Sequence, residues 1–159
     1  MARGYVEQSL QPGERVYYRA KLHWIIFVPA LIFTALAAVV AFNASNSAAL
    51  RLGLVLAGAF MIGAAWVRRV TTEIAVTDRR FIFKVGLLRR TTGEINVEKI
   101  EGVEVRQSVI GRLFNYGTVI VKGIGLGYEP VRAVAQPLNL RMVINEVGNR
   151  NGASLSSAL

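Results

Sequence analysis

Few side chains in this 159-residue sequence are of the types that carry out catalysis or bind metals. There is no cysteine, which excludes thiol nucleophiles, disulfides and cysteine-based metal sites. The single histidine, His23, precedes Trp24 at the start of a long apolar segment, a position more typical of an interfacial anchor than of a general base. Without a second histidine, the common zinc sites are also excluded. We therefore expect no catalytic residue, no bound metal and no cofactor.

Two other patterns could bind ions in principle. The first pattern is a group of four carboxylates that could hold a hard cation. Alternation of side chains along a strand places them on a connecting segment and on a solvated strand face, so ordinary surface charge explains them. These carboxylates are Glu94, Glu98, Glu101 and Glu104. Glycines at 123, 125 and 127 resemble a phosphate-binding loop, but a Tyr-Glu-Pro turn and a strand follow them, whereas such a loop needs a helix. We expect a hairpin turn there.

Basic residues are the remaining candidates for a binding site. The chain has 19 Lys and Arg against 10 Asp and Glu, a formal charge of +9. Such a charge suits nucleic acid and the anionic inner leaflet of a membrane equally well. We predict contacts with anionic lipid or an acidic partner, while a solvated positive face without a specific ligand is the simpler alternative. The candidate residues are Arg68, Arg69, Arg79, Arg80, Lys84, Arg89 and Arg90.

Two long apolar segments precede most of these residues. Residues 24–42 are 19 residues without a charge, which as a helix span roughly 28 Å, close to the apolar thickness of a bilayer. Residues 48–67 form a second segment whose one charge, Arg51, lies near an end and can reach the interface. We predict a transmembrane helical hairpin over residues 24–67. A buried hairpin of a soluble protein is the alternative, but it would normally show a polar stripe, which neither segment has.

The charges that flank these segments predict an orientation. Four basic residues precede the first segment and five follow the second, whereas the connection offers only Arg51. Because positively charged flanks stay in the cytoplasm, we expect a multi-pass protein of the bacterial inner membrane with both termini cytoplasmic. Residues 1–23 are then a cytoplasmic N-terminal segment. Trp24 and Trp66 fall where aromatic residues of the inner interface are expected.

Beyond Arg69 the hydrophobic pattern changes from continuous to alternating. Short alternating runs separated by turn residues are typical of an antiparallel β sandwich or barrel. The sequence therefore predicts one small β domain over residues 70–148. The expected strands lie near residues 72–77, 81–85, 88–95, 103–106, 118–122 and 131–135.

Two interruptions of this pattern predict helices. Residues 109–113 are expected to form a single turn. Residues 137–147 begin with Pro137 and are followed by Gly148, both common at helix ends. Their apolar side chains follow helical spacing, so we expect an amphipathic helix that caps the open end of the sheet. The stripe consists of Leu140, Val143, Ile144 and Val147. Residues 149–159 are rich in Asn, Ser, Ala and Gly, and we expect them to be disordered.

Several short motifs lie along the parts of the chain that flank and follow the apolar segments. They are a TDRR turn at 77–80, GLLRR at 86–90, KIEGVEVRQS at 99–108, GRLFNYGTV at 111–119, and the leader LQPGE at 10–14. These motifs resemble those of the bacterial pleckstrin-homology-like (PH-like) membrane proteins. The resemblance covers most of the chain, including the two preceding apolar segments. Two positions differ from the pattern: Asn96 replaces an expected proline, and GIGLG at 123–127 replaces a turn rich in threonine and glycine.

The resemblance implies a PH-like fold and membrane association, and it implies no reaction. We therefore expect an α+β protein, with a transmembrane hairpin followed by a PH-like antiparallel β domain and a C-terminal amphipathic helix. The expected function is a non-enzymatic interaction or scaffolding module that binds membrane lipids and protein partners or its own copies. The alternative is an accessory subunit of a channel, transporter or other membrane complex. Nucleic acid and small-molecule substrates are not expected.

Overall fold

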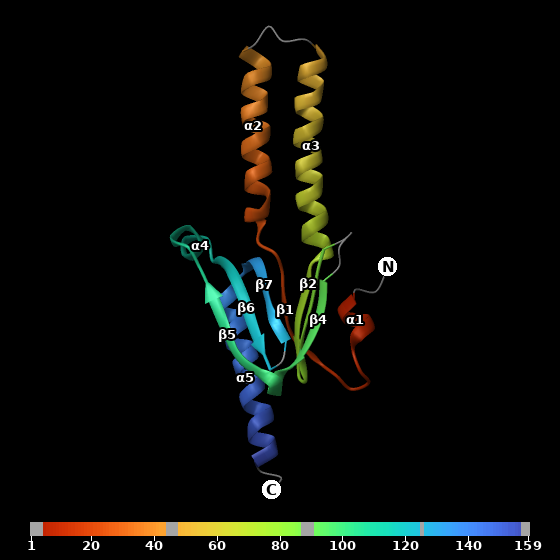
Figure 1. Cartoon of the computed structure of the whole chain (residues 1–159), viewed down its shortest axis with the longest axis vertical. Helices are drawn as coiled ribbons and strands as arrows, with labels where there is room; N and C mark the ends of the chain where they lie inside the picture. The colour runs from red at the N-terminus through yellow and green to blue at the C-terminus, as the bar shows by residue number, and fades with distance from the viewer. Residues whose placement is uncertain (1–4, 44–47, 87–90, 125, 157–159) are drawn as a thin grey trace. The chain divides into compact units, whose positions relative to one another are not determined.

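The computed structural model describes residues 5–43, 48–86, 91–124 and 126–156 (Figure 1). They belong to two compact units. One consists of Trp24–Val70, and the other combines Met1–His23 with Thr71–Leu159. The chain therefore starts in the second unit, leaves it for the first, and returns. The two units are described separately below.

The first unit is a helical hairpin. A short 3-10 helix, η1 (Trp24–Phe27), leads into α2 (Val28–Asn43), and α3 (Ala48–Thr71) follows. Both apolar segments are helical as predicted, and α3 continues four residues past the expected end at 67. The connection at 44–47 lies outside the described residues. The helices approach each other closely at Gly58, where an added Cβ would lie 2.8 Å from Thr34 Oγ1.

The second unit contains two antiparallel sheets, as the alternating pattern predicted. The strand order in the first sheet is β1-β2-β3-β4 and in the second β5-β6-β7. The first sheet consists of β1 (Val16–Ala20), β2 (Glu73–Thr77), β3 (Arg80–Val85) and β4 (Thr91–Asn96). The second consists of β5 (Ile100–Arg106), β6 (Tyr116–Gly123) and β7 (Leu126–Ala135). The remaining elements are α1 (Tyr5–Ser9), η2 (Val97–Lys99), α4 (Val109–Leu113) and α5 (Pro137–Ser156).

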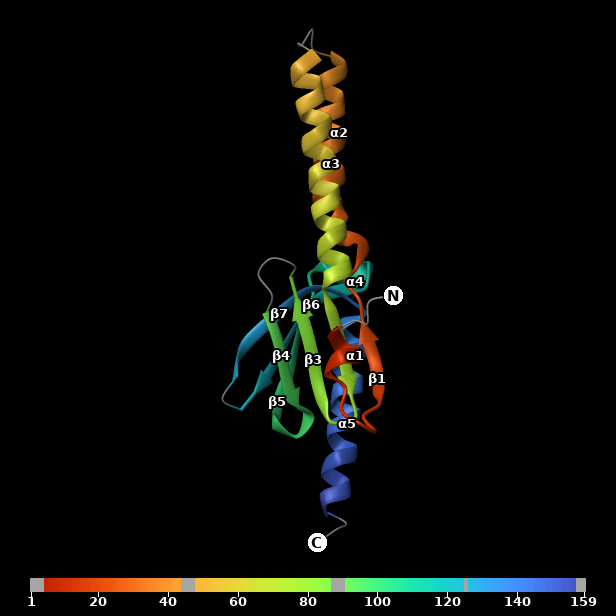
Figure 2. The same ribbon diagram turned by 90° about the vertical axis from the view of Figure 1, so that its right-hand side faces the viewer.

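The N-terminal segment is part of this β domain, which corrects the predicted domain boundaries. Strand β1 pairs with β2, with Ala20 opposite Ile74, so the helical hairpin is inserted between two neighbouring strands. Helix α1 lies over the outer face of the same sheet, where Val6 packs against Ala75 and Ile82 (Figure 2). The pairing partner of β1 follows more than fifty residues later, so no neighbouring alternating run in the sequence marks β1 as one strand of a pair.

The main core lies between the sheets and α5. Side chains from both sheets, including Val76, Phe81 and Val119, form one buried cluster with the predicted helical stripe. Leu140, Ile144 and Val147 of that stripe are buried, and Val143 packs at its edge. The predicted register of the capping helix is therefore confirmed.

Helix α5 does not end at Gly148, where the sequence predicted a stop. Gly148 remains helical and lies close to Val97. A Cβ added at Gly148 would lie 3.5 Å from Val97 Cγ1. One turn further on, the side-chain amide of Asn151 donates a hydrogen bond to the Asp78 carbonyl at 2.8 Å. These contacts lie beyond the expected helix end at 147, and α5 runs to Ser156. Residues 157–159 lie outside the described part.

Candidate functional site

The predicted basic residues that the structure describes belong to two different compact units. Arg68 and Arg69 belong to the last turn of α3, in the helical unit. Arg79 and Arg80 lie at the turn between β2 and β3, and Lys84 lies further along β3. Arg89 and Arg90 fall outside the described residues. The members of the proposed site therefore have to be considered one by one.

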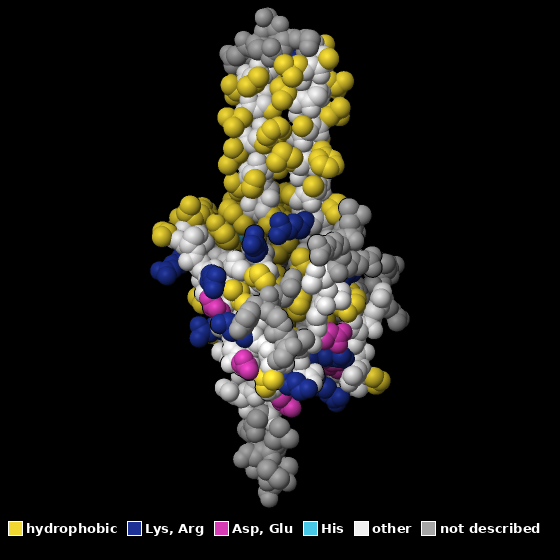
Figure 3. Space-filling view, in the orientation of Figure 1, with side chains coloured by type: hydrophobic (Ala, Val, Ile, Leu, Met, Phe, Trp, Pro, Cys, Tyr) yellow, Lys and Arg dark blue, Asp and Glu magenta, His cyan; other side chains and the backbone are white. Residues whose placement is uncertain are grey.

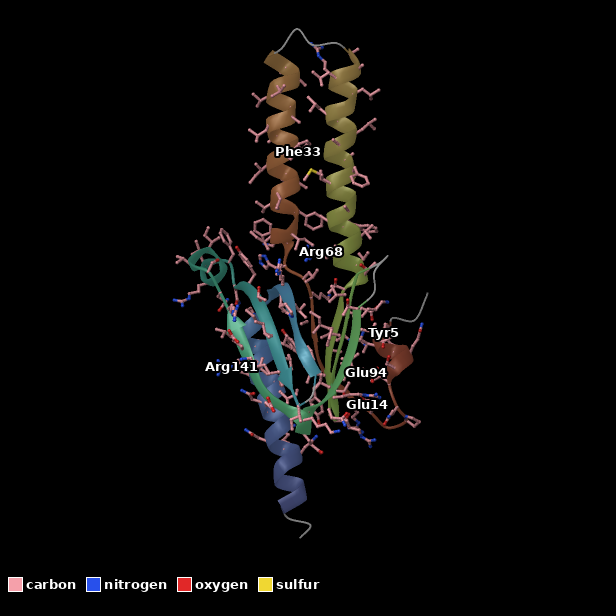
Figure 4. All side chains as sticks on the ribbon, viewed as in Figure 1. Tyr5, Glu14, Phe33, Arg68, Glu94 and Arg141 are labelled. Atoms are coloured by element: carbon pink, nitrogen blue, oxygen red, sulfur yellow. The ribbon has the colours of Figure 1, made fainter. Side chains whose placement is uncertain are left out.

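Arg80 is held inside the β domain by two carboxylates from distant parts of the chain. Its Nε donates to Glu14 Oε1 at 2.9 Å, and a terminal nitrogen donates to Glu14 Oε2 at 2.7 Å. The other terminal nitrogen bonds Glu94 on β4 (Figure 4). The Glu14 side chain is 0% exposed and that of Arg80 is 13% exposed. A bidentate guanidinium–carboxylate pair of this kind is among the stronger polar contacts in proteins.

Further hydrogen bonds complete this network and fix the charges within it. The Thr77 hydroxyl and the Gln11 amide donate to the Glu14 carboxylate at 2.7 and 2.8 Å. The hydrogen bond from Arg80, aided by these two, lowers the pKa of Glu14 from 4.5 to about 2 despite its burial. Glu14 in turn raises the pKa of Arg80. Both groups therefore stay charged at neutral pH.

This network bears on the prediction that Arg80 binds anionic lipid, which stays a prediction. One guanidinium faces two carboxylates, Glu14 and Glu94, so the cluster carries no excess positive charge. The network also explains two of the sequence motifs, because Glu14 closes the LQPGE leader and Arg80 closes the TDRR turn. Sequence reasoning missed the contact because 66 residues separate its partners. Their shared function is to join the N-terminal segment to the sheet.

Lys84 likewise attaches an N-terminal element. Its ammonium lies 3.6 Å from a Glu73 oxygen and 5.5 Å from the centre of the Tyr5 ring. The same Glu73 carboxylate accepts hydrogen bonds from the backbone amides of Tyr5 and Val6, both at 3.1 Å. Charge and hydrogen bonding thus hold α1 on the sheet. Lys84 is less available for a ligand than its place in the sequence suggested.

Arg79 is exposed, but it lies at the far end of β2 from the point where the chain enters the domain. Strand β2 starts two residues after Thr71, the end of α3, and runs to Thr77. Five residues of strand extend about 17 Å. Beside Arg79, a hollow of about 500 Å³ is lined by side chains of both signs, including Asp78 and Glu98. The mixed charge does not favour an anionic ligand.

A second hollow contains basic residues that the sequence analysis did not select. A groove of about 810 Å³ lies among β5, α4, β6 and the start of α5 and is lined by Arg106, Arg112 and Arg141. The charge of Arg106 is partly neutralised by Glu104, whose Oε1 lies 2.6 Å from Arg106 Nε. No sequence signal links these three arginines, because they lie on three different elements. The groove is the more basic of the two hollows.

The end of this groove is fixed by residues of the 99–108 and 111–119 motifs. The Ser108 hydroxyl accepts a hydrogen bond from the Gly111 amide at 3.0 Å and caps α4. The Gln107 side chain donates to the Tyr116 carbonyl at 3.1 Å. An added Cβ at Gly111 would lie 2.7 Å from that same carbonyl oxygen, so glycine is required. The two motifs therefore hold α4 tightly against the start of β6.

The geometry of two antiparallel sheets closed by a C-terminal helix agrees with the comparison to protein families. The family model described as Bacterial PH domain matches residues 25–147. The chain belongs to the bacterial PH domain family. None of the curated proteins and none of the solved structures matches it. The family match begins after β1, so α1 and β1 lie outside the matched residues, although β1 pairs with β2 in the same sheet.

PH-like domains are in general binding modules without catalytic activity, and they interact with lipids or proteins. Within the described ranges of this bacterial PH domain, no three His, Asp or Glu residues converge as metal ligands. His23 stacks on the Tyr116 ring, with 5.3 Å between ring centres. The arrangement therefore offers surfaces for binding.

Proposed function

We infer that this protein is a membrane-anchored interaction module, in which α2 and α3 cross a bilayer and hold the bacterial PH domain at its surface. The apolar character of the helices carries this proposal. The helical stretches Trp24–Phe42 and Ala48–Thr71 have mean hydropathies of 2.7 and 1.9, and only 6% of each apolar window is buried. A core helix of a soluble protein would bury most of its apolar surface, so these helices need an apolar environment from outside the chain.

The β pairing supports a hairpin whose two ends lie on the same side of the bilayer. The chain leaves the PH domain after β1 and returns at β2, and these strands are direct neighbours with Ala20 opposite Ile74. Paired strands lie about 5 Å apart, so the first residue of the hairpin and the last are anchored close together. Both ends of the hairpin must therefore lie on the same side of the bilayer, which requires an even number of membrane crossings. The two helices α2 and α3 provide two crossings.

The basic flanks support a cytoplasmic location of the PH domain. Arg68 and Arg69 close the last turn of α3, where Arg69 lies over the Phe27 ring, 5.9 Å from its centre. Both are exposed, so their heads can reach lipid phosphates while their stems remain in apolar surroundings. The connection at the opposite end has only Arg51 nearby. This asymmetry favours the inner membrane of a bacterium, with both termini in the cytoplasm.

The working partner of the module is a protein or a second copy of the chain. Anchoring by two helices makes lipid affinity unnecessary for recruitment, so the surfaces of the PH domain are available for other contacts. The general character of PH-like domains as non-catalytic binding modules supports a non-enzymatic scaffold. An accessory subunit of a larger membrane complex remains the alternative function.

Two measurements on the native protein test this proposal. Membranes washed with alkaline carbonate should retain the chain, because an integral hairpin is released only by detergent. Release by carbonate would contradict anchoring. The mass of the particle purified in mild detergent then distinguishes the two functions. A homo-oligomer supports the interaction module, whereas a stoichiometric complex with other membrane proteins supports the accessory subunit.

A further inference from the structure

Helix α4 presents apolar side chains to solvent instead of to the core. Val109 is 84% exposed, Ile110 58% and Leu113 78%, and Phe114 directly after the helix is 45% exposed. Figure 3 shows these yellow side chains gathered over α4. Helices on the surface of a soluble domain normally turn their apolar side inward. The apolar tip, defined as Val109, Ile110, Leu113 and Phe114, therefore needs a covering partner.

The apolar tip lies at the end of the domain where the chain leaves for the helical hairpin. Tyr116, two residues after the tip, stacks on His23 with 5.3 Å between ring centres. The His23 amide also donates a hydrogen bond to the Ala133 carbonyl of β7 at 2.7 Å. His23 is covalently bonded to Trp24, the first residue of the apolar helices. The tip is therefore close to the point at which the chain enters α2.

The covalent link from His23 to Trp24 supports a place for the tip near the lipid headgroups if α2 spans the bilayer, because Trp24 is the first residue of the apolar helices. The headgroup region of one leaflet is roughly 5–8 Å thick, taken as half the difference between the full and the apolar thickness. An apolar helix at that depth lies against the boundary between headgroups and acyl chains, where short apolar and aromatic segments are stable.

The positive charge of Arg112 also suits a position among lipid headgroups. Arg112 lies between the apolar residues on α4, and it lines the basic groove together with Arg141 of α5. An exposed arginine beside inserted apolar side chains can pair with lipid phosphates through its planar fork of donors. Leu138, also exposed, continues the apolar surface along that groove.

We propose that the apolar tip of α4 inserts into the bilayer interface, with Arg112 at the lipid phosphates, and so fixes the PH domain on the membrane that the hairpin crosses. This inference rests on the proposed membrane anchoring. The tip then supplies a contact with the membrane in addition to the two connections between the domain and the hairpin. The basic groove then lies beside the membrane surface, and the turn of Arg79 lies at the end away from it.

Spin labelling of the full chain tests this insertion. Because the protein has no native cysteine, single cysteines can be placed without other changes. Val109→Cys and Leu113→Cys report on the tip, and both side chains are exposed, so folding should be retained. Leu36→Cys on α2 is the control for lipid, and Arg79→Cys is the control for water. The labelled chains are reconstituted in phosphatidylethanolamine and phosphatidylglycerol vesicles, and collisions with oxygen and with a water-soluble nickel complex are compared.

Insertion predicts that labels at 109 and 113 collide more with oxygen and less with nickel than the label at 79. If labels at 109 and 113 behave like that at 79 while the label at 36 is in lipid, the insertion is wrong and the anchoring stands. A label at 36 that is open to nickel would instead contradict the anchoring. Spin–spin broadening at 113 that disappears on dilution with unlabelled chain would also overturn the insertion, because the tip would then contact a second copy.

Discussion

The buried pair of Glu14 and Arg80 gives the most quantitative prediction. We expect Glu14→Gln, which keeps the side-chain shape and removes the charge, to destabilise the PH domain strongly. The fall of the Glu14 pKa from 4.5 to about 2 is the basis for the magnitude. At about 1.4 kcal/mol per pKa unit, it corresponds to about 3 kcal/mol of unfolding free energy at neutral pH. Loss of one partner from a buried ion pair typically costs a similar amount.

The same pair predicts how stability depends on pH. The folded-state pKa of Glu14 is depressed, so its contribution is fully present above the unfolded pKa of 4.5 and is lost as pH falls toward about 2. Wild-type protein should therefore lose more unfolding free energy than Glu14→Gln between pH 5 and pH 2. The two proteins should be closest in stability at the acidic end.

Urea unfolding in mild detergent, followed by circular dichroism, measures both effects. Glu146→Gln is the matched control, because Glu146 pairs with Arg150 on the exposed face of α5. Surface pairs of this kind contribute less than about 1 kcal/mol. If Glu14→Gln is no less stable than Glu146→Gln, or if its pH profile matches that of the wild type, the network does not join the N-terminal segment to the sheet.

Two further substitutions test the packing of the β domain. Ile144→Asp should place a carboxylate in the core and cost several kcal/mol of unfolding free energy, while Met142→Asp on the exposed side of the same helix should be mild; equal thermal stabilities would refute the α5 register. Gly93→Ala should cost about 1–3 kcal/mol, because its Cβ would lie 2.4 Å from the buried Phe83 ring, whereas Gly102→Ala meets nothing within 4 Å; urea midpoints that do not separate the two would contradict this packing.

Elements with a strong local pattern could be predicted from the sequence. The apolar helices, the turn at 109–113 and the stripe of α5 each depend on the spacing of neighbouring side chains, and each is present where it was expected. The PH-like fold followed from motifs whose residues make short-range turns and caps, such as Ser108 with Gly111. Local pattern and local structure coincide in these cases.

Features that depend on distant partners could not be predicted. Strand β1 exists because β2 pairs with it, and α5 extends past Gly148 because Val97 and Asp78 contact it. The carboxylate partners of Arg80 were hidden for the same reason, since a buried arginine and an exposed one look identical in the sequence. The exposure of Val109 and Leu113 was likewise hidden, because apolar residues in a short turn are usually buried.

Access to single cysteines from the two sides of the membrane tests the central claim most directly. One cysteine replaces Ser45 in the connection between the apolar helices, and another replaces Ser156 near the C-terminus. The account predicts that an impermeant thiol reagent labels position 45 in intact spheroplasts and labels position 156 only after lysis. Labelling of position 156 in intact spheroplasts, with position 45 protected until lysis, would contradict the cytoplasmic location of the bacterial PH domain.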